Sequence, residues 1–261
     1  MLKTGIYVDA ENIRLCGGYG MRYDVLAQLA NVRPSVLLRA NSYVVEDQKR
    51  TREDPEYRQK VYNYFDILRN CGFKLIKKYV KFFVDEEGEV TTKANADMDL
   101  AIDALLQSRN LDRIILLTGD GDFVRLVTAL QNKGCRVEVI GFNNVSAELR
   151  EAADLYLSGF LVPGLLPIGA KANGDEWFRG VPINYNPGRG FGFMRYYRLS
   201  PDGLTSESVF FHYSKSQGEL DPQLFSNPAN IFEFRVAVNR QNQNRREAQD
   251  IHLYACDDDK R

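Results

Sequence analysis

One stretch decides the fold of this chain: Ile114-Ile115-Leu116-Leu117-Thr118-Gly119-Asp120-Gly121-Asp122-Phe123. Its four leading apolar residues predict a buried strand, and the glycines and aspartates after them end that strand. The segment that follows, residues 124–130, has the apolar spacing of a helix. A strand that turns into a helix here places two carboxylates at its carboxyl end, which is the edge where open α/β sheets bind ligands.

Strands and helices alternate through the first 160 residues. Strands are predicted at residues 5–8, 36–45, 73–84, 114–117 and 136–140, and helices at residues 24–30, 55–71, 95–107, 124–133 and 146–153. This alternation predicts an α/β fold with a parallel sheet covered by helices on both faces. The charged run at residues 46–56 is predicted to be a solvated loop, and residues 85–89 a hairpin-like turn.

The composition is that of a globular protein. The chain has 261 residues, of which 44% are hydrophobic and 26% charged, and its formal net charge is -1. Its four cysteines are widely spaced, which predicts free thiols in a reducing compartment rather than a disulfide framework or a zinc site. No targeting peptide is visible, and no apolar run reaches the roughly 20 residues that a membrane helix needs. We therefore expect a cytoplasmic protein with no membrane partner; whether it is a homo-oligomer stays open.

The composition changes after Phe160. Residues 162–174 contain two prolines and three glycines, which is typical of a linker. From Trp177 onward, short aromatic and β-branched segments alternate with turn sequences such as Asn186-Pro187-Gly188, which predicts a small all-β barrel. We therefore divide the chain into a first domain at residues 1–162, a linker at 163–176, a barrel at 177–256 and a tail at 257–261.

Acidic side chains follow two of the predicted strands. Asp9 ends the first strand, and Asp120 and Asp122 end the strand of the opening stretch, so neighbouring central strands would bring the three together. Carboxylates gathered in one cleft repel each other unless a cation neutralises them. Oxygen ligands without a nearby histidine or cysteine favour Mg²⁺ or Mn²⁺, and such a site binds phosphate oxygens and activates a water. The competing interpretation is helix capping, which suffices for a lone residue such as Asp122.

Three further aspartates lie on the helix before the opening stretch. Asp99 and Asp103 share one face of it, whereas Asp97 is rotated from Asp99 by about 200° at roughly 100° per residue. Asp97 and Asp99 therefore do not both point into one site unless one of them sits in an irregular first turn. Asp103, a turn deeper, is predicted to be structural and to pair with a basic group.

Four blocks occur in order along this region. They are Tyr7-Val8-Asp9-Ala10-Glu11-Asn12, Lys93 with Ala96-Asp97-Met98-Asp99-Leu100-Ala101-Ile102-Asp103, Thr118-Gly119-Asp120-Gly121-Asp122-Phe123, and Ser146-Ala147-Glu148-Leu149 with Ala153-Asp154. Together they resemble the NYN (LabA-like) domain, a branch of the PIN-like nucleases. The resemblance implies a Rossmann-like PIN fold and metal-dependent cleavage of RNA. It implies a site in which Asp9, Asp97, Asp120 and Asp122 hold the metal, Asn12 orients the site, Thr118 and Ser146 support it, and Asp99 is the alternative helix ligand.

The barrel carries a second signal, Arg189-Gly190-Phe191-Gly192-Phe193-Met194 followed by Val209-Phe210-Phe211-His212. Strand alternation puts Phe191 and Phe193 on one face, where exposed aromatic rings stack on splayed bases, although a barrel interior also needs phenylalanines. The two motifs resemble the RNA-binding motifs of cold-shock domains, which are OB-fold barrels. The sequence departs from that family at Asn184, where a tryptophan is usual, and in the loop at residues 214–230. We expect Phe191, Phe193, Phe210 and His212 to stack on bases and Arg189 to contact the RNA backbone.

These patterns predict a Mg²⁺- or Mn²⁺-dependent endoribonuclease that cleaves single-stranded RNA and binds it through the C-terminal OB-fold barrel. A catalytically idle RNA-binding adaptor or regulator is the main alternative. A metal-dependent phosphatase for small molecules would explain the carboxylates but would leave the aromatic barrel without a role. The first strand also lacks the Asp-x-Asp pattern of phosphoaspartyl enzymes, since it ends in Asp9-Ala10-Glu11.

Overall fold

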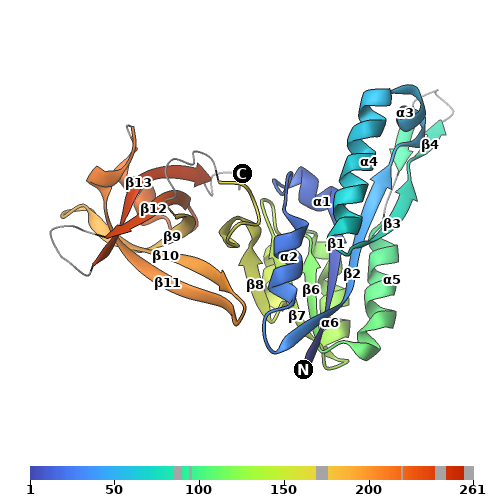
Figure 1. The fold of residues 1–261 in the computed structure, drawn as a ribbon, viewed down its shortest axis with the longest axis horizontal. Helices are drawn as coiled ribbons and strands as arrows, with labels where there is room; N and C mark the ends of the chain where they lie inside the picture. The colour runs from blue at the N-terminus through green and yellow to red at the C-terminus, as the bar shows by residue number, and fades with distance from the viewer. Residues whose placement is uncertain (85–89, 94–95, 169–175, 219, 239–244, 256–261) are drawn as a thin grey trace. The chain divides into compact units, whose positions relative to one another are not determined.

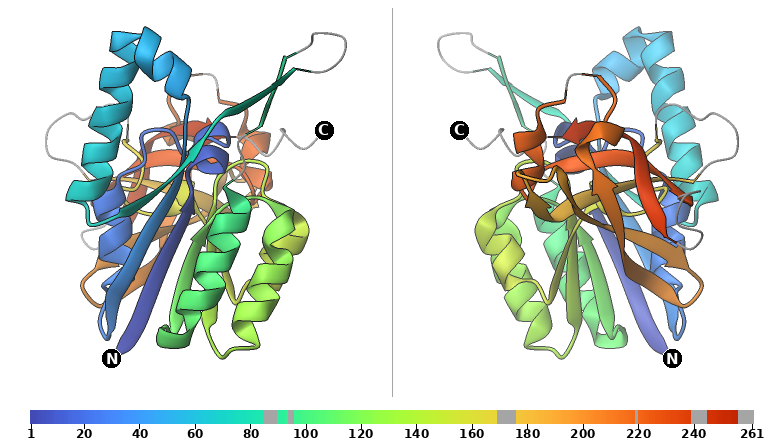
Figure 2. Two further views of the ribbon diagram at one scale, coloured as in Figure 1. Left: turned by 90° about the vertical axis from the view of Figure 1, so that its right-hand side faces the viewer. Right: turned by 90° about the vertical axis from the view of Figure 1, so that its left-hand side faces the viewer.

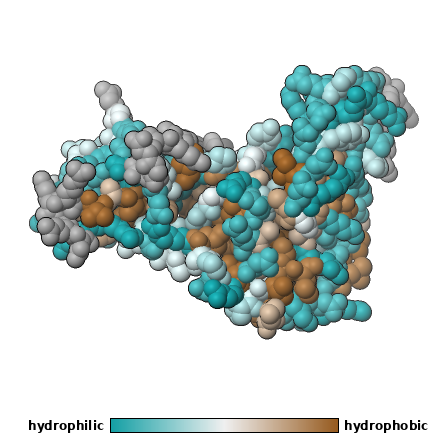
Figure 3. All heavy atoms as spheres, in the orientation of Figure 1, coloured by the Kyte–Doolittle hydropathy of each residue, from teal (hydrophilic) through white to brown (hydrophobic). Residues whose placement is uncertain are grey.

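The computed structural model describes residues 1–84, 90–93, 96–168, 176–218, 220–238 and 245–255. The chain forms two compact units, Met1–Ser158 and Gly159–Arg261, and each is described by itself below. Within the described residues, no helix combines the length and the apolar character needed to cross a membrane. Polar side chains cover the part of the first unit where α3 (Gln48–Glu53) meets α4 (Pro55–Asn70) (Figure 3).

A six-stranded parallel sheet forms the centre of the first unit, in the order β3-β2-β1-β6-β7-β8 (Figure 1). The strands are β1 (Leu2–Asp9), β2 (Ser35–Glu46), β3 (Lys74–Tyr79), β6 (Arg113–Leu117), β7 (Arg136–Gly141) and β8 (Leu155–Ser158). The central strands are almost continuously apolar because both of their faces are covered. β1 lies beside β6, with Val8 opposite Leu117, so the carboxyl ends of the two strands that carry the acidic motifs are adjacent.

Helices cover both faces of this sheet (Figure 2). Besides α3 and α4, they are α1 (Ala10–Leu15), α2 (Tyr23–Ala30), α5 (Asp97–Gln107), α6 (Val124–Gln131) and α7 (Ala147–Ala152). Leu100 of α5, Val127 of α6 and Leu149 of α7 pack with Leu116 in one buried apolar cluster. On the other face, Tyr23 of α2 bonds Tyr64 of α4 through their hydroxyls. The α/β class and the parallel sheet are therefore confirmed.

The structure corrects two local predictions, at residues 46–56 and 73–84. Residues 46–56 are not a loop: Asp47 caps α3 by accepting the backbone N–H of Arg50, and Asp54 caps α4 in the same way through Tyr57. Residues 73–84 are not one strand, since β3 joins the main sheet while β4 (Lys81–Val84) pairs with β5 (Val90–Lys93) in a separate antiparallel ribbon. β8 was not predicted. The predicted turn at residues 85–89 lies outside the described residues.

The second unit contains a closed five-stranded barrel in the order β10-β11-β13-β12-β9. Its strands are β9 (Trp177–Asn186), β10 (Phe191–Ser200), β11 (Gly203–His212), β12 (Ile231–Val238) and β13 (Arg246–Ala255). Neighbouring strands are antiparallel except for β11 and β13, which pair in parallel at Phe210 and Glu247. A five-stranded closed barrel of this kind is consistent with an OB-fold. Its interior is filled by large apolar side chains, among them Phe178, Met194, Tyr196, Phe211, Phe225, Phe232 and Phe234.

A buried cation ties the segment before the barrel to the barrel wall. Arg179 on β9 is 6% exposed and forms an ion pair with the equally buried Glu233 at 3.2 Å between Nη2 and Oε1. The same Nη2 donates to the carbonyl of Pro167 at 2.6 Å, and Nη1 donates to that of Leu166 at 3.5 Å. Leu165 and Leu166 are themselves buried, so residues 165–167, which were predicted as linker, belong to the packed structure of this unit. Residues 169–175 of that linker lie outside the described residues.

The described cysteines Cys16, Cys71 and Cys135 are free thiols, as the sequence predicts, and Cys256 lies outside the described residues.

Candidate functional site

Asp9 is the buried acid of the first unit. It ends β1, is 7% exposed, and caps α1: Oδ1 accepts the Asn12 backbone N–H at 3.1 Å. Its Oδ2 accepts the Thr118 hydroxyl at 3.3 Å. The pKa of Asp9 is raised from 3.8 to about 6, first because the carboxyl is buried and then because the carboxylates of Asp97 and Asp120 lie within electrostatic range; the bonds from Asn12 and Thr118 oppose the rise. Asp9 is therefore the centre of an acidic cluster drawn from three different elements.

The turn after β6 presents Asp120. Thr118 is fully buried, and its Oγ1 accepts the Asp120 backbone N–H at 3.2 Å while its hydrogen is given to Asp9. Asp120 caps the short 3₁₀ helix η2 (Gly121–Phe123), with Oδ1 accepting the Asp122 N–H at 2.9 Å. Asp120 is partly exposed to solvent, whereas Asp9, which shares Thr118 with it as a hydrogen-bonding partner, is buried.

Asn12 and Ser146 fix the turn from two sides. The Asn12 side-chain Oδ1 accepts the Gly119 N–H at 2.8 Å, and the Ser146 backbone N–H donates to the Gly119 carbonyl at 2.9 Å. Ser146 also caps α7 through its hydroxyl, which accepts the Leu149 N–H at 3.4 Å. A Cβ at position 121 would stand 3.0 Å from the Ser146 hydroxyl oxygen, so a glycine there lets the two loops pack closely. Asn12, Thr118 and Ser146 therefore all contact this turn or the Asp9 carboxylate, and their orienting and supporting roles stay predictions.

The helix aspartates separate into different environments. Asp97 opens α5 and acts on Asp9 electrostatically. Asp99 instead pairs with Lys78 of β3 at 2.5 Å. Asp103 accepts the Tyr43 hydroxyl at 2.9 Å, so its partner is a phenol and not the basic group expected from the sequence. Of the two alternatives that helical geometry left open, Asp97 is thus the one associated with Asp9.

Asp122 differs from Asp9 in its environment, because its side chain is exposed to solvent. Within the described ranges, no three His, Cys, Asp or Glu side chains lie close enough to form a ready-made metal cage. Asp9, Asp97 and Asp120 nevertheless interact electrostatically, and all their donor atoms are oxygens. That donor set fits a hard cation such as Mg²⁺, which is usually held by one or two carboxylates together with waters and substrate phosphates.

Three aromatic residues of the β10–β11 pair lie together outside the barrel core. Phe193 is 40% exposed, and it stands opposite Phe210 across the β10–β11 pair, with ring centroids 5.9 Å apart. Phe191 is half-buried and lies 5.8 Å from the same Phe210 ring. By contrast Phe211, which alternates with Phe210, is fully buried. The motif therefore divides between an outer aromatic patch, namely Phe191, Phe193 and Phe210, and the barrel core.

Two neighbours of this patch were missed by the sequence reasoning. Tyr213 is 43% exposed and stacks on His212 at 5.1 Å, because β11 ends at His212 and a 3₁₀ turn keeps the next ring on the same side. Arg195 is exposed and follows Phe193 at the strand period of two, which is the signal that would have identified it.

Two turns border the patch, one after β11 and one between β9 and β10. His212 Nδ1 accepts the Ser214 backbone N–H at 3.2 Å and lies 2.8 Å from its hydroxyl. The Arg189 backbone N–H donates to the Asn186 side chain at 3.1 Å, and the Arg189 side chain is exposed. Gly190 has φ +68° and lies under Tyr213, whose ring would be 2.4 Å from a Cβ there. The turn therefore allows the tyrosine ring to lie directly against the backbone.

Comparison with known proteins identifies a family for the first unit. Residues 3–161 match the NYN domain family. The low amplitude and bright protein LabA of Synechococcus elongatus is 32% identical over 162 residues, which cover 59% of this chain and 82% of that protein. The crystal structure of a protein of unknown function from Vibrio parahaemolyticus is 27% identical, with a TM-score of 0.48 over 60% of this chain and 92% of that one. The matched residues 3–161 include Asp9, Asp97 and Asp120.

Proposed function

This chain belongs to the NYN-domain family, and we propose that it is a Mg²⁺- or Mn²⁺-dependent endoribonuclease that cleaves single-stranded RNA and binds it through its C-terminal barrel. The family supports a nuclease-type activity of the first unit. The observation that carries the proposal further is the buried Asp9 carboxylate, whose charge interacts with those of Asp97 and Asp120. A buried acid that is surrounded by other acids, with few compensating groups, favours a bound cation.

The residues that would hold the cation are Asp9, Asp97 and Asp120. When bound, the cation would neutralise the phosphate oxygens and make an attacking water more acidic. Asn12 and Thr118 keep the Asp9 carboxylate in one orientation, because each of its oxygens accepts one of their hydrogen bonds. We place the exposed Asp122 at the rim, where it would act on substrate or on a second cation.

The outer aromatic patch is the proposed RNA-binding surface. Phe193 is exposed and Phe210 is half-buried, and the exposed Arg189 and Arg195 add cationic groups on the same unit. Stacking of a base on an exposed aromatic ring contributes about 1–3 kcal/mol, whatever the base. We therefore expect binding with little sequence preference and a clear dependence on salt.

The adaptor alternative rests on one observation: the carboxylates form no ready-made cage within the described residues. A protein whose acidic site is idle would still bind RNA through the barrel. A ribonuclease and an adaptor would both bind RNA, but only the ribonuclease would cleave it. RNA binding and RNA cleavage therefore both need to be measured.

The test uses labelled single-stranded RNA, the full chain, and Mn²⁺. Asp120→Asn should abolish cleavage and keep RNA binding, whereas Asp112→Asn should retain both, since Asp112 accepts the Lys3 N–H at the opposite, amino-terminal end of the sheet. Equal cleavage by the wild type and Asp120→Asn would exclude the assigned site. Binding without cleavage by the wild type would establish the adaptor. If Phe193→Ala with Phe210→Ala leaves RNA affinity unchanged, the barrel is not the RNA-binding surface.

A further inference from the structure

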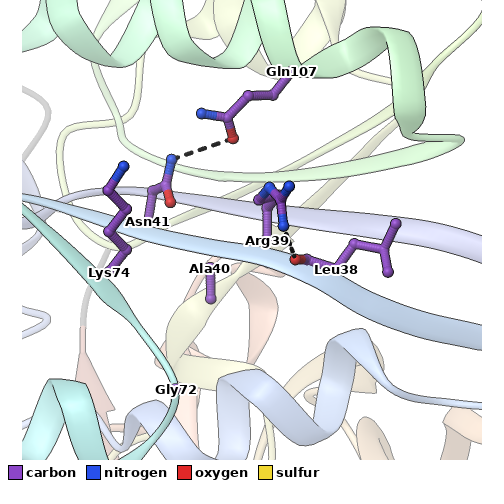
Figure 4. Close-up of a pocket in the computed structure, with 7 residues that line it drawn as sticks. All are labelled: Leu38, Arg39, Ala40, Asn41, Gly72, Lys74 and Gln107. Atoms are coloured by element: carbon purple, nitrogen blue, oxygen red, sulfur yellow. Dashed lines mark hydrogen bonds between the residues drawn. The ribbon is translucent and has the colours of Figure 1, made fainter.

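A second site lies on the first unit, away from the acidic edge. β1 flanks β2 from Ser35 to Tyr43, but β3 pairs with β2 only from Asn41 onward, so the earlier part of β2 has a neighbour on one side. Beside that free edge is a pocket of about 490 Å³ (Figure 4). It is lined by Leu38, Arg39, Ala40, Asn41, Gly72, Lys74 and Gln107. Arg39 precedes Tyr43, the residue opposite Asp9, by four positions, or about 13 Å along the strand.

Two cations enter this pocket without a carboxylate partner. Arg39 and Lys74 are both exposed, and neither forms an ion pair with an acid in the part of the chain that the structure describes. Arg39 uses one nitrogen, Nη1, to donate to the Leu38 carbonyl at 3.0 Å. Both side chains point to the side of the sheet where α5 carries Gln107 (Figure 4). Cations that share a hollow raise the local concentration of anions.

A chain of hydrogen bonds fixes the orientation of the Gln107 amide, whose NH₂ group is a further donor in the pocket. The Asp103 carboxylate accepts from the Tyr43 hydroxyl, so the Tyr43 oxygen is the acceptor for Asn41 Nδ2 at 3.3 Å. Asn41 Nδ2 also donates to Gln107 Oε1 at 3.4 Å, and the Tyr7 hydroxyl donates to that same oxygen at 3.1 Å. Burial, and then the Asp103 carboxylate, keep the pKa of the Tyr7 hydroxyl above its ordinary range, so Tyr7 stays a donor. The Gln107 side-chain oxygen therefore accepts two hydrogen bonds. Its NH₂ group remains available as a donor, since no described residue accepts from it.

The pocket therefore offers a guanidinium, an ammonium and an amide NH₂. The nearby carboxylate, Asp103, is already bonded to Tyr43, and one acid against two cations leaves the site net positive. The unprotonated oxygens of a phosphate group are hydrogen-bond acceptors, and this combination of Arg, Lys and amide donors suits them. The volume lies within the range of about 300–1,000 Å³ typical of small-molecule sites.

The geometry points to a binding site for a small phosphate-bearing ligand at Arg39, Lys74 and Gln107. This site is separate from the carboxylate edge and does not depend on the proposed ribonuclease activity. Asn41, which is 1% exposed, is the positioning residue that orients the Gln107 amide.

The experiment titrates the full chain with inorganic phosphate and with pyrophosphate, at constant ionic strength, by ³¹P NMR and calorimetry. Arg39→Gln with Lys74→Gln should weaken binding by about tenfold or more, because charge-assisted hydrogen bonds are lost. Gln107→Glu should abolish it by repulsion while still accepting from Tyr7. The matched control is Lys133→Gln, which removes an exposed cation that does not line the pocket and should leave the affinity unchanged.

Three outcomes would overturn the assignment. They are the absence of binding of either probe to the folded wild type, unchanged affinity in both pocket variants, and equal loss in Lys133→Gln. A competition experiment distinguishes a small phosphate-bearing ligand from the phosphates of RNA. A single-stranded oligoribonucleotide should not displace pyrophosphate, and the pocket variants should bind it like the wild type. If the RNA does displace pyrophosphate and the variants lose RNA affinity, the pocket is part of an RNA path and not a small-ligand site.

Discussion

Replacing Asp9 by asparagine should make the metal-free protein more stable at neutral pH. Asp9 is buried, and the carboxylates of Asp97 and Asp120 lie within electrostatic range, so its charged form is disfavoured in the folded state. Asparagine keeps an oxygen for the Asn12 N–H and turns its NH₂ toward the Thr118 hydroxyl, so the substitution removes a charge and keeps the shape. The reason for a gain is that burial of an ionised carboxyl costs free energy when no cation is bound.

The magnitude follows from the pKa. Raising the pKa of Asp9 from 3.8 to about 6 corresponds to about 3 kcal/mol. Because the folded-state pKa lies above the unfolded one, the penalty is absent below pH 3.8, grows as the pH rises toward 6, and is fully present above 6. Asp9→Asn should therefore gain up to about 3 kcal/mol of unfolding free energy at pH 7.5 and show almost no gain near pH 4.

Urea unfolding in EDTA at several pH values between 4 and 7.5 measures this difference. All the α-helices of the described residues belong to the first unit, and the single tryptophan of the chain, Trp177, belongs to the second, so circular dichroism at 222 nm reports the first unit and tryptophan fluorescence the barrel. Asp122→Asn, an exposed acid on the same edge, is the control and should change little. A variant that is no more stable than the wild type at pH 7.5, or whose gain persists at pH 4, would refute the reasoning. Mn²⁺ should raise the unfolding midpoint of the wild type and not that of Asp9→Asn.

The remaining predictions concern the helix acids and the barrel. Asp97→Asn should lose RNA cleavage while Asp99→Asn retains it, since the first interacts with the buried acid of the site and the second is paired with a lysine; equal rates would contradict this assignment. Phe211→Ala should destabilise the barrel by about 3–5 kcal/mol in tryptophan-monitored unfolding, whereas Phe193→Ala should change its stability by less than about 1 kcal/mol and weaken RNA binding by about 1–3 kcal/mol. Gly190→Ala should lower barrel stability by about 1–2 kcal/mol, because alanine is strained at φ +68° and its Cβ meets a ring at 2.4 Å; an unchanged midpoint would show that the turn relaxes freely.

The parts of the fold that depend on local pattern could be predicted from the sequence. The runs at residues 5–8 and 114–117 carry no charged side chain and predict buried strands, and the adjacency of these strands brings their acidic motifs to one edge. Helices such as α4 and α5 show their period directly in the sequence. Helix α3 was missed because its six residues are all polar, and its formation depends on the Asp47 cap rather than on an apolar face.

The details of the site depend on partners far away in the sequence. Asp99 is paired with Lys78, which reaches it from β3, 21 positions earlier in the sequence. The pairing of Asp103 with Tyr43 joins residues 60 positions apart and is equally invisible to helical spacing. Such contacts form only when the strands are in place. The sequence therefore identifies the aspartates of this helix as candidates but does not predict the partner of each one.

Arg179 limits how the second unit can be handled as a separate module. Its guanidinium is 4% exposed at the side chain and needs the carbonyls of Leu166 and Pro167 as well as Glu233. An excised barrel that started at Trp177 would bury a cation with two of its acceptors cut away, at a cost of about 1–3 kcal/mol for each unmet bond. Expression boundaries and domain fusions should therefore begin at Gly159, since the barrel includes the peptide segment that precedes its first strand.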